Sequence, residues 1–171
     1  MESHKLVSME DLKEGDVVLT VEDNELVETI VIGFLDHRVT ENIMYLKVSI
    51  GNGTELKISK THVIFVINNE GQLIPKLGKD LRVGEHVTSV HNSLLQTSQI
   101  VGITSSSHVG VYVPLTDRGT ILVDGVLVSC YTNVDHSLAH LAFVPARWAN
   151  SYFGRKIVVI MIRTYESQIS T

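Results

Sequence analysis

The stretch Lys79-Asp80-Leu81-Arg82-Val83-Gly84-Glu85-His86-Val87-Thr88-Ser89-Val90 repeats an earlier one, Glu10-Asp11-Leu12-Lys13-Glu14-Gly15-Asp16-Val17-Val18-Leu19-Thr20-Val21. The Asp-Leu pair, the Gly followed by an acid, and two valines recur at a constant offset. At the same offset, Ile100-Val101-Gly102 falls on Val31-Ile32-Gly33. We interpret this as an internal duplication, which predicts two similar subdomains packed about a pseudo-two-fold axis, with a site where they meet.

Strand-forming residues dominate the chain, because Val, Ile and Thr are abundant and short apolar runs alternate with turn signals. We expect strands at residues 17–21, 26–35, 43–50, 54–59 and 63–67, with one helical turn at 9–12. The charged cluster Asp36-His37-Arg38 is expected to separate the second strand from the third. A short helical segment is expected near residues 135–150, before Pro145 stops it. The predicted fold is therefore all-β.

Composition restricts the class of protein. The 171 residues are 44% hydrophobic and 19% charged, which excludes a disordered chain and allows one domain with a real core. The net charge of −5 and the lack of a Lys/Arg-rich run argue against nucleic-acid binding. The single cysteine, Cys130, cannot form a disulfide within the chain. No apolar signal segment follows Met1.

A polar break at Ser59-Lys60-Thr61-His62 separates two apolar strands. A hydroxyl and an imidazole three residues apart can point at one spot, polarise a carbonyl and protonate a leaving group. Ser and Thr are also ordinary turn residues, and a single His at the start of a strand is often structural. Both interpretations stay open on this stretch alone, and Thr61 is as good a hydroxyl as Ser59.

Three further motifs have simpler explanations than the chemistry they suggest. Asp36 follows an apolar run and could act as a base, but a surface ion pair with Arg38 is the simpler interpretation. The motif His91-Asn92 resembles the end of a self-splicing intein, but half the chain follows it, so we interpret it as a loop. Asn52-Gly53-Thr54 fits a glycosylation sequon and a hairpin turn, and we prefer the turn.

A metal site is not expected from the sequence. Cys130, His136 and His140 could supply three ligands, because histidines four residues apart share one face of a helix. A fourth ligand with recognisable spacing is missing, although structural zinc sites usually need four. We therefore expect no metal and no cofactor.

The segment from Gly110 to Tyr131 closely resembles the autoprocessing (Hog/Hint) domain of Hedgehog proteins. Pro114-Leu115-Thr116-x-x-Gly119-Thr120 and Ser129-Cys130-Tyr131 are the most specific elements. Residues 136–147, 12–19 and 61–62 are similar to other parts of the family's pattern, in the family's order. The resemblance covers about residues 5–148. We expect residues 1–148 to form the domain, with 149–171 as an unassigned tail.

This resemblance implies an all-β Hint horseshoe of two duplicated subdomains, and it implies self-cleavage. In the family, a Cys at the first position of the domain attacks the preceding carbonyl to give a thioester, which a sterol then displaces. By resemblance, His62 matches the family's His, Ser59 takes its Thr position, Asp36 matches its Asp, and Cys130 matches its second Cys. The implied partners are the precursor's own N-terminal signalling domain in cis and a sterol acceptor. The implied location is the secretory pathway, including the endoplasmic reticulum, and the extracellular space.

The chain departs from the family pattern at three points, and these leave two hypotheses for its function. The family's first Cys would lie before Met1, so this chain is expected to be a fragment of a longer precursor that lacks the N-terminal Cys segment. Ser59 keeps the hydroxyl of Thr but loses the methyl that fixes its rotamer. Few residues follow Arg147, where a sterol-recognition region would lie, so the chain itself does not support a sterol acceptor. The alternative is a degenerate Hint domain that serves as a structural or interaction module.

Overall fold

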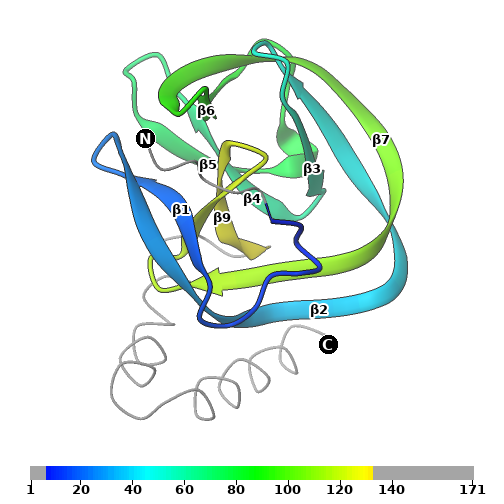
Figure 1. The fold of residues 1–171 in the computed structure, drawn as a ribbon. Helices are drawn as coiled ribbons and strands as arrows, with labels where there is room; N and C mark the ends of the chain where they lie inside the picture. The colour runs from blue at the N-terminus through cyan, green and yellow to red at the C-terminus, as the bar shows by residue number, and fades with distance from the viewer. Residues whose placement is uncertain (1–6, 133–171) are drawn as a thin grey trace.

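The computed structural model describes residues 7–132, and almost all of them belong to strands or tight turns (Figure 1). The strands are β1 (Val17–Glu22), β2 (Glu25–Ile50), β3 (Glu55–Ser59), β4 (His62–Ile67), β5 (Leu73–Leu77), β6 (His86–His91), β7 (Leu94–Thr116), β8 (Thr120–Val123) and β9 (Val126–Thr132), with one 3-10 turn, η1 (Gly78–Asp80). The all-β prediction is confirmed. The helical segment predicted near 135–150 lies outside the described residues.

Two very long strands form the frame of the molecule. β2 and β7 run antiparallel side by side along the outside of the fold, and both curve around the remaining strands (Figure 1). The register between them shifts at four places, including one between Arg38 and Asn42. Such bulges bend a strand without ending it, and this lets one pair of strands reach from one subdomain to the other.

The continuity of β2 contradicts one prediction. The sequence suggested two strands separated by Asp36-His37-Arg38, but the chain stays extended through this cluster. Residues two apart point to the same side of a strand, so Asp36 and Arg38 can pair without a turn. The Nε atom of Arg38 donates to Asp36 Oδ1 at 2.8 Å. The charged run is therefore part of a strand that solvent reaches on this side. The helical turn predicted at 9–12 is also absent, because residues 9–11 form a simple turn.

The duplicated sequence produces equivalent hydrogen bonds in the two halves. The Gly15 N–H donates to the Val31 carbonyl at 2.8 Å, and the Gly84 N–H donates to the Ile100 carbonyl at 2.8 Å. Both glycines have positive φ, 89° and 99°, a conformation that residues with a Cβ adopt at a cost. The recurring Gly therefore marks the same turn in each half, which supports the duplication.

The hairpin turns after β1 and after β6 are equivalent as well. Asp23 and Asn24 have φ of 49° and 65°, and Asn92 and Ser93 have φ of 51° and 61°. Two consecutive residues with positive φ are typical of the tight turns that match the twist of a hairpin. Asn92 therefore lies in a turn, as the sequence suggested, whereas His91 is the last residue of β6.

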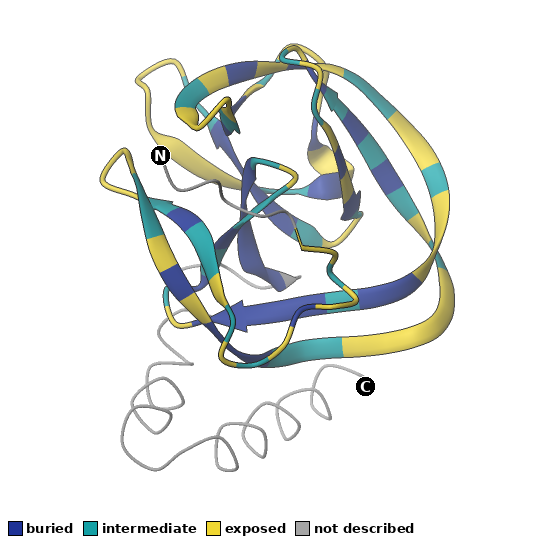
Figure 2. Cartoon of the chain, in the orientation of Figure 1, coloured by how far each residue is buried: buried dark blue, intermediate teal, exposed yellow. Residues whose placement is uncertain are grey.

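The strands form one sheet in the order β1-β2-β7-β6-β4-β9-β8, with β3 paired to β2 and β5 paired to β4. Buried residues lie mainly on the faces that point toward the centre of the molecule (Figure 2). The core joins both halves and includes Val48, Leu56, Ile64, Val87, Ile100, Leu115 and Val126. Within residues 7–132, no helix is long and apolar enough to cross a membrane.

Candidate functional site

A cavity of about 1280 Å³ lies where the two halves of the fold meet. Ser59, His62 and Cys130 all contribute to its walls, from the end of β3, the start of β4 and the end of β9. β4 and β9 are neighbours in the sheet, with His62 opposite Thr132. Three of the four predicted site residues are therefore brought to one cavity by elements far apart in the sequence.

His62 makes the tightest contact in this group. Its Nε2 atom lies 2.6 Å from the carbonyl oxygen of Ser129, the residue before Cys130. A carbonyl can only accept, so Nε2 carries a proton, and a neutral ring then has Nδ1 as its acceptor. Burial lowers the pKa of His62, and the Ser129 carbonyl, which favours the charged ring, only partly offsets that effect. The ring is therefore neutral at neutral pH and has a fixed tautomer.

Ser59 is the last residue of β3, and the η1 turn packs against the backbone at this point. Its Oγ lies 3.4 Å from the Oγ1 atom of Thr61, so the two hydroxyls that the sequence suggested are adjacent. A Cβ on Gly78 would come within 2.4 Å of the Ser59 carbonyl oxygen, and the Lys79 N–H donates to the Lys60 carbonyl at 2.9 Å. The η1 turn thus packs directly on the corner that separates Ser59 from His62.

Cys130 lies where the two parts of the Pro-Leu-Thr-x-x-Gly-Thr and Ser-Cys-Tyr pattern meet. Its side chain is buried, with only 1% exposed. Its N–H donates to the Gly119 carbonyl at 2.9 Å, and its Sγ lies 3.5 Å from Thr116 Oγ1. These contacts show that the two stretches, which stand apart in the sequence, pack directly against each other.

Asp36 is not among the residues that line the cavity. Its carboxylate forms an ion pair with Arg38, with 31% of the Asp36 side chain exposed. The structure therefore shows the surface pair that the local sequence favoured, and it does not bring Asp36 into direct contact with the other three residues. Whether Asp36 takes part in the chemistry stays a prediction.

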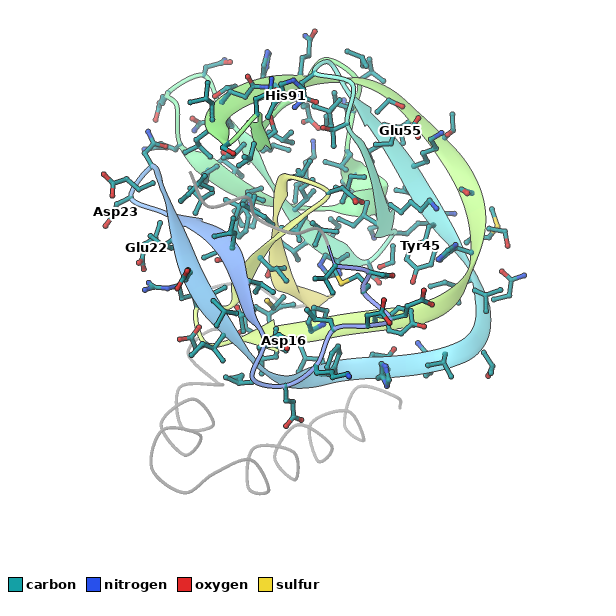
Figure 3. All side chains as sticks on the ribbon, in the orientation of Figure 1. Asp16, Glu22, Asp23, Tyr45, Glu55 and His91 are labelled. Carbon is teal, nitrogen blue, oxygen red and sulfur yellow. The ribbon has the colours of Figure 1, made fainter. Side chains whose placement is uncertain are left out.

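Two groups at the cavity were not predicted from the sequence. The first is the Ser129 carbonyl, which orients His62. A backbone acceptor cannot be recognised from residue types, and the only sequence signal here is the Ser-Cys-Tyr motif that contains it. Tyr45 lies on the inner side of the arc made by β2 and β7, near the end of β3 (Figure 3). Burial also raises the pKa of Asp124, another residue that lines the cavity, although Lys57 works against this shift.

The metal-site interpretation receives no support from the described part of the chain. His136 and His140 lie outside it, so their distance to Cys130 is not known. Within residues 7–132, no group of three or more His, Cys, Asp or Glu side chains is arranged to hold a metal ion. The arrangement at the cavity is instead a neutral imidazole, a hydroxyl and a buried thiol. Such groups can move protons and hold a developing negative charge.

Comparison with known proteins identifies the family. The family model of the Hint module matches residues 1–161, so the chain belongs to the Hint module family. It is 32% identical over 168 residues to the Indian hedgehog B protein of Danio rerio, which covers 89% of this chain and 40% of that protein. It is 31% identical over 143 residues to the protein hedgehog of Drosophila melanogaster, which covers 80% of this chain and 30% of that protein. The chain therefore spans well under half the length of these relatives.

Solved structures support the same fold. A crystal structure of a DnaB intein from Synechocystis sp. PCC 6803 has a TM-score of 0.61 at 18% identity, covering 73% of this chain and 86% of the intein. The gp41-1 intein has a TM-score of 0.55 at 13% identity, covering 71% of this chain and 84% of the intein. Identities this low establish the Hint fold and nothing finer.

Proposed function

We propose that this Hint module is the autoprocessing domain of a hedgehog-type precursor, and that it cleaves the peptide bond before itself by an N–S acyl shift. The observation that carries the proposal is the convergence of Ser59, His62 and Cys130 on one cavity, with His62 held by the carbonyl next to Cys130. Homology to hedgehog proteins and the Hint match agree with it. The partner in cis is the precursor's N-terminal signalling domain, and the location is the secretory pathway and the extracellular space.

The first step needs the thiol of a cysteine that directly follows the bond to be cleaved. Neutral His62 takes the thiol proton, and the sulfur attacks the preceding carbonyl carbon to form a tetrahedral oxyanion. The Ser59 hydroxyl donates a hydrogen bond to that oxyanion. The carbon–nitrogen bond then breaks as the imidazolium returns its proton to the leaving nitrogen. The products are a thioester on sulfur and a free amine, and the proton has moved from sulfur to nitrogen.

In the second step an acceptor replaces the thioester. The hydroxyl of the acceptor attacks the carbonyl carbon, the carbon–sulfur bond breaks, and the acceptor's proton goes to the released thiolate. By the family resemblance the first acceptor to test is a sterol. Asp36 is proposed to assist this step, because its carboxylate is paired with Arg38 and is partly open to solvent.

The test uses a fusion in which a reporter domain and a Cys-containing segment precede Met1. Dithiothreitol is added, and cleavage is followed by gel electrophoresis and intact mass. We expect thiol-dependent release of the reporter, loss of release in His62→Ala, and normal release in the control His91→Ala, whose histidine is exposed. Adding cholesterol in place of dithiothreitol tests the sterol acceptor separately.

The competing hypothesis is a degenerate Hint domain that acts as a structural or interaction module. It predicts that the fusion remains intact with dithiothreitol although circular dichroism shows a folded β protein. It also predicts that His62→Ala changes stability only. A folded, uncleaved fusion would therefore reject the autoprocessing proposal in favour of the module.

A further inference from the structure

Tyr45 lies next to Ser59 at the cavity, on β2, the strand that also carries Asp36. It lies in β2 directly opposite Ser59 in the β2–β3 ladder, so both side chains point to the same side of the sheet. Residues paired in this way have Cβ atoms about 5 Å apart. Tyr45 and Ser59 both line the cavity. Tyr45 is therefore the immediate cross-strand neighbour of the proposed oxyanion donor.

The Tyr45 hydroxyl is bonded to β7, the strand that pairs with β2 on the side away from β3. It donates to the Gly110 carbonyl of β7 at 2.8 Å. Gly110 has a φ of 99°, and a Cβ there would lie 2.6 Å from the ring of Tyr112. A residue with a side chain would therefore meet both backbone strain and a clash, so Gly110 holds its carbonyl in a direction that other residues could reach only at a cost. The bond ties the β2 residue opposite Ser59 to a β7 carbonyl four residues beyond Ser106, its partner in the β2–β7 ladder.

The electrostatic environment keeps the hydroxyl protonated. Burial raises the pKa of Tyr45, and the negative charge of Asp36 raises it further, while Arg38 acts in the opposite direction. A protonated phenol can donate to the Gly110 carbonyl, and a phenolate could not. The bond therefore persists through neutral and moderately alkaline pH. The charges of the Asp36–Arg38 pair act on the pKa of Tyr45 through space.

We propose that Tyr45 is a positioning residue for the acyl shift, which fixes the Ser59 end of β3 relative to β7 through its hydrogen bond to the Gly110 carbonyl. The proposal rests on the proposed function, because Ser59 needs a fixed position only if it holds a developing charge. Preorganised donors lose much of their effect when they are displaced by a fraction of an ångström. Ser59 lacks the β-methyl that would restrict its own rotamer, so the position of the strand that carries it matters more.

The test compares Tyr45→Phe with Tyr112→Phe in the Cys-containing fusion. Tyr45→Phe keeps the ring and removes the hydroxyl, and we expect dithiothreitol-dependent cleavage to slow by about tenfold, the rate equivalent of one hydrogen bond. Tyr112→Phe is the matched control at the same wall and is expected to stay within about twofold of the unmodified fusion, since its hydroxyl is not assigned a role.

A double-mutant cycle separates positioning from general destabilisation. If Tyr45 acts through Ser59, Tyr45→Phe in a Ser59→Ala background slows cleavage by no more than about twofold. The proposal would be overturned if Tyr45→Phe slowed cleavage as much in the Ser59→Ala fusion as in the fusion that keeps Ser59. It would also be overturned if Tyr45→Phe cleaved at the same rate as the unmodified fusion.

A second measurement, made on the chain without the fusion partner, tests the positioning role of Tyr45 independently of cleavage. Amide hydrogen exchange across residues 55–61 is measured in the unmodified chain and in Tyr45→Phe. We expect faster exchange in the variant, with no change for Tyr112→Phe, because the Gly110 bond restrains this strand. Unchanged exchange would reject the positioning role even if the fusion does not cleave, whereas a fusion that is folded and uncleaved with faster exchange would reject only the proposed function.

Discussion

The Nε2 atom of His62 lies 2.6 Å from the carbonyl oxygen of Ser129, and this contact ties the first residue of β4 to β9 beside Cys130. The bond fixes both the ring orientation and the position of its proton. A histidine that was ambiguous as a turn residue thereby becomes a neutral imidazole with a fixed orientation at the wall of a cavity. The first prediction follows from the cost of burying that ring.

Stability should depend on pH through His62. Because burial lowers its pKa, the unfolded chain takes up the ring proton at higher pH than the folded protein does. The free energy of unfolding should therefore fall as the pH drops below about 6.5, and the loss should end once the folded ring also protonates. Urea unfolding from pH 7.5 to 4.5 measures this. His62→Gln should remove this part of the pH dependence, whereas His91→Gln should retain it. Parallel pH profiles for His62→Gln and the unmodified protein would contradict the assignment.

The duplication predicts equal consequences at equivalent core positions. Val31 and Ile100 are both 0% exposed and occupy corresponding places in the two halves. Val31→Ala and Ile100→Ala should each lower the free energy of unfolding by between about 2 and 4 kcal/mol, because both leave a cavity in the core. Val101→Ala, at a side chain that is 53% exposed, should change it by less than about 0.5 kcal/mol. Chemical denaturation checks all three. A loss confined to one of the two variants would contradict the equivalence of these positions.

Both polar atoms of the Asn52 side-chain amide should stabilise the turn between β2 and β3. Its Oδ1 accepts from the Thr54 N–H at 3.0 Å, and its Nδ2 donates to Ser89 Oγ at 3.3 Å. Asn52→Ala should cost about 1 to 2 kcal/mol of unfolding free energy, because it removes two hydrogen bonds between β2, β3 and β6. The exposed Asn69→Ala serves as the control. Equal midpoints for the two variants in thermal unfolding would show that the Asn52 amide is not holding the turn.

The Asp36–Arg38 pair should contribute little to stability. Half of the Arg38 side chain is exposed, and exposed ion pairs contribute less than about 1 kcal/mol. Asp36→Asn and Arg38→Gln should therefore leave thermal unfolding almost unchanged. If Asp36 assists acceptor attack, Asp36→Asn should slow transfer to a sterol while dithiothreitol-dependent release continues. Equal effects of both variants on transfer would indicate that the pair acts structurally.

Local patterns predicted most of the fold. Alternating residues with turn signals between them specify strands, since they describe which side of a strand is buried. The Gly-acid turns at Gly15 and Gly84 revealed the duplication, because both positions need a positive φ. The long strand β2 was missed because a charged cluster resembles a turn in sequence. Only the pairing with β7 shows that bulges carry the strand through it.

The sequence by itself determined which residues are candidates at the site, since His62 lies in a polar break between apolar strands and the resemblance to the Hog/Hint domain selected Ser59 and Cys130. Tertiary structure alone decided that these three line one cavity and that Asp36 does not. It also assigned His62 its tautomer through a backbone carbonyl, and it placed Tyr45 opposite Ser59. The physical reason is that strand pairing between distant segments sets these distances, and spacing along the chain does not encode which strands become neighbours.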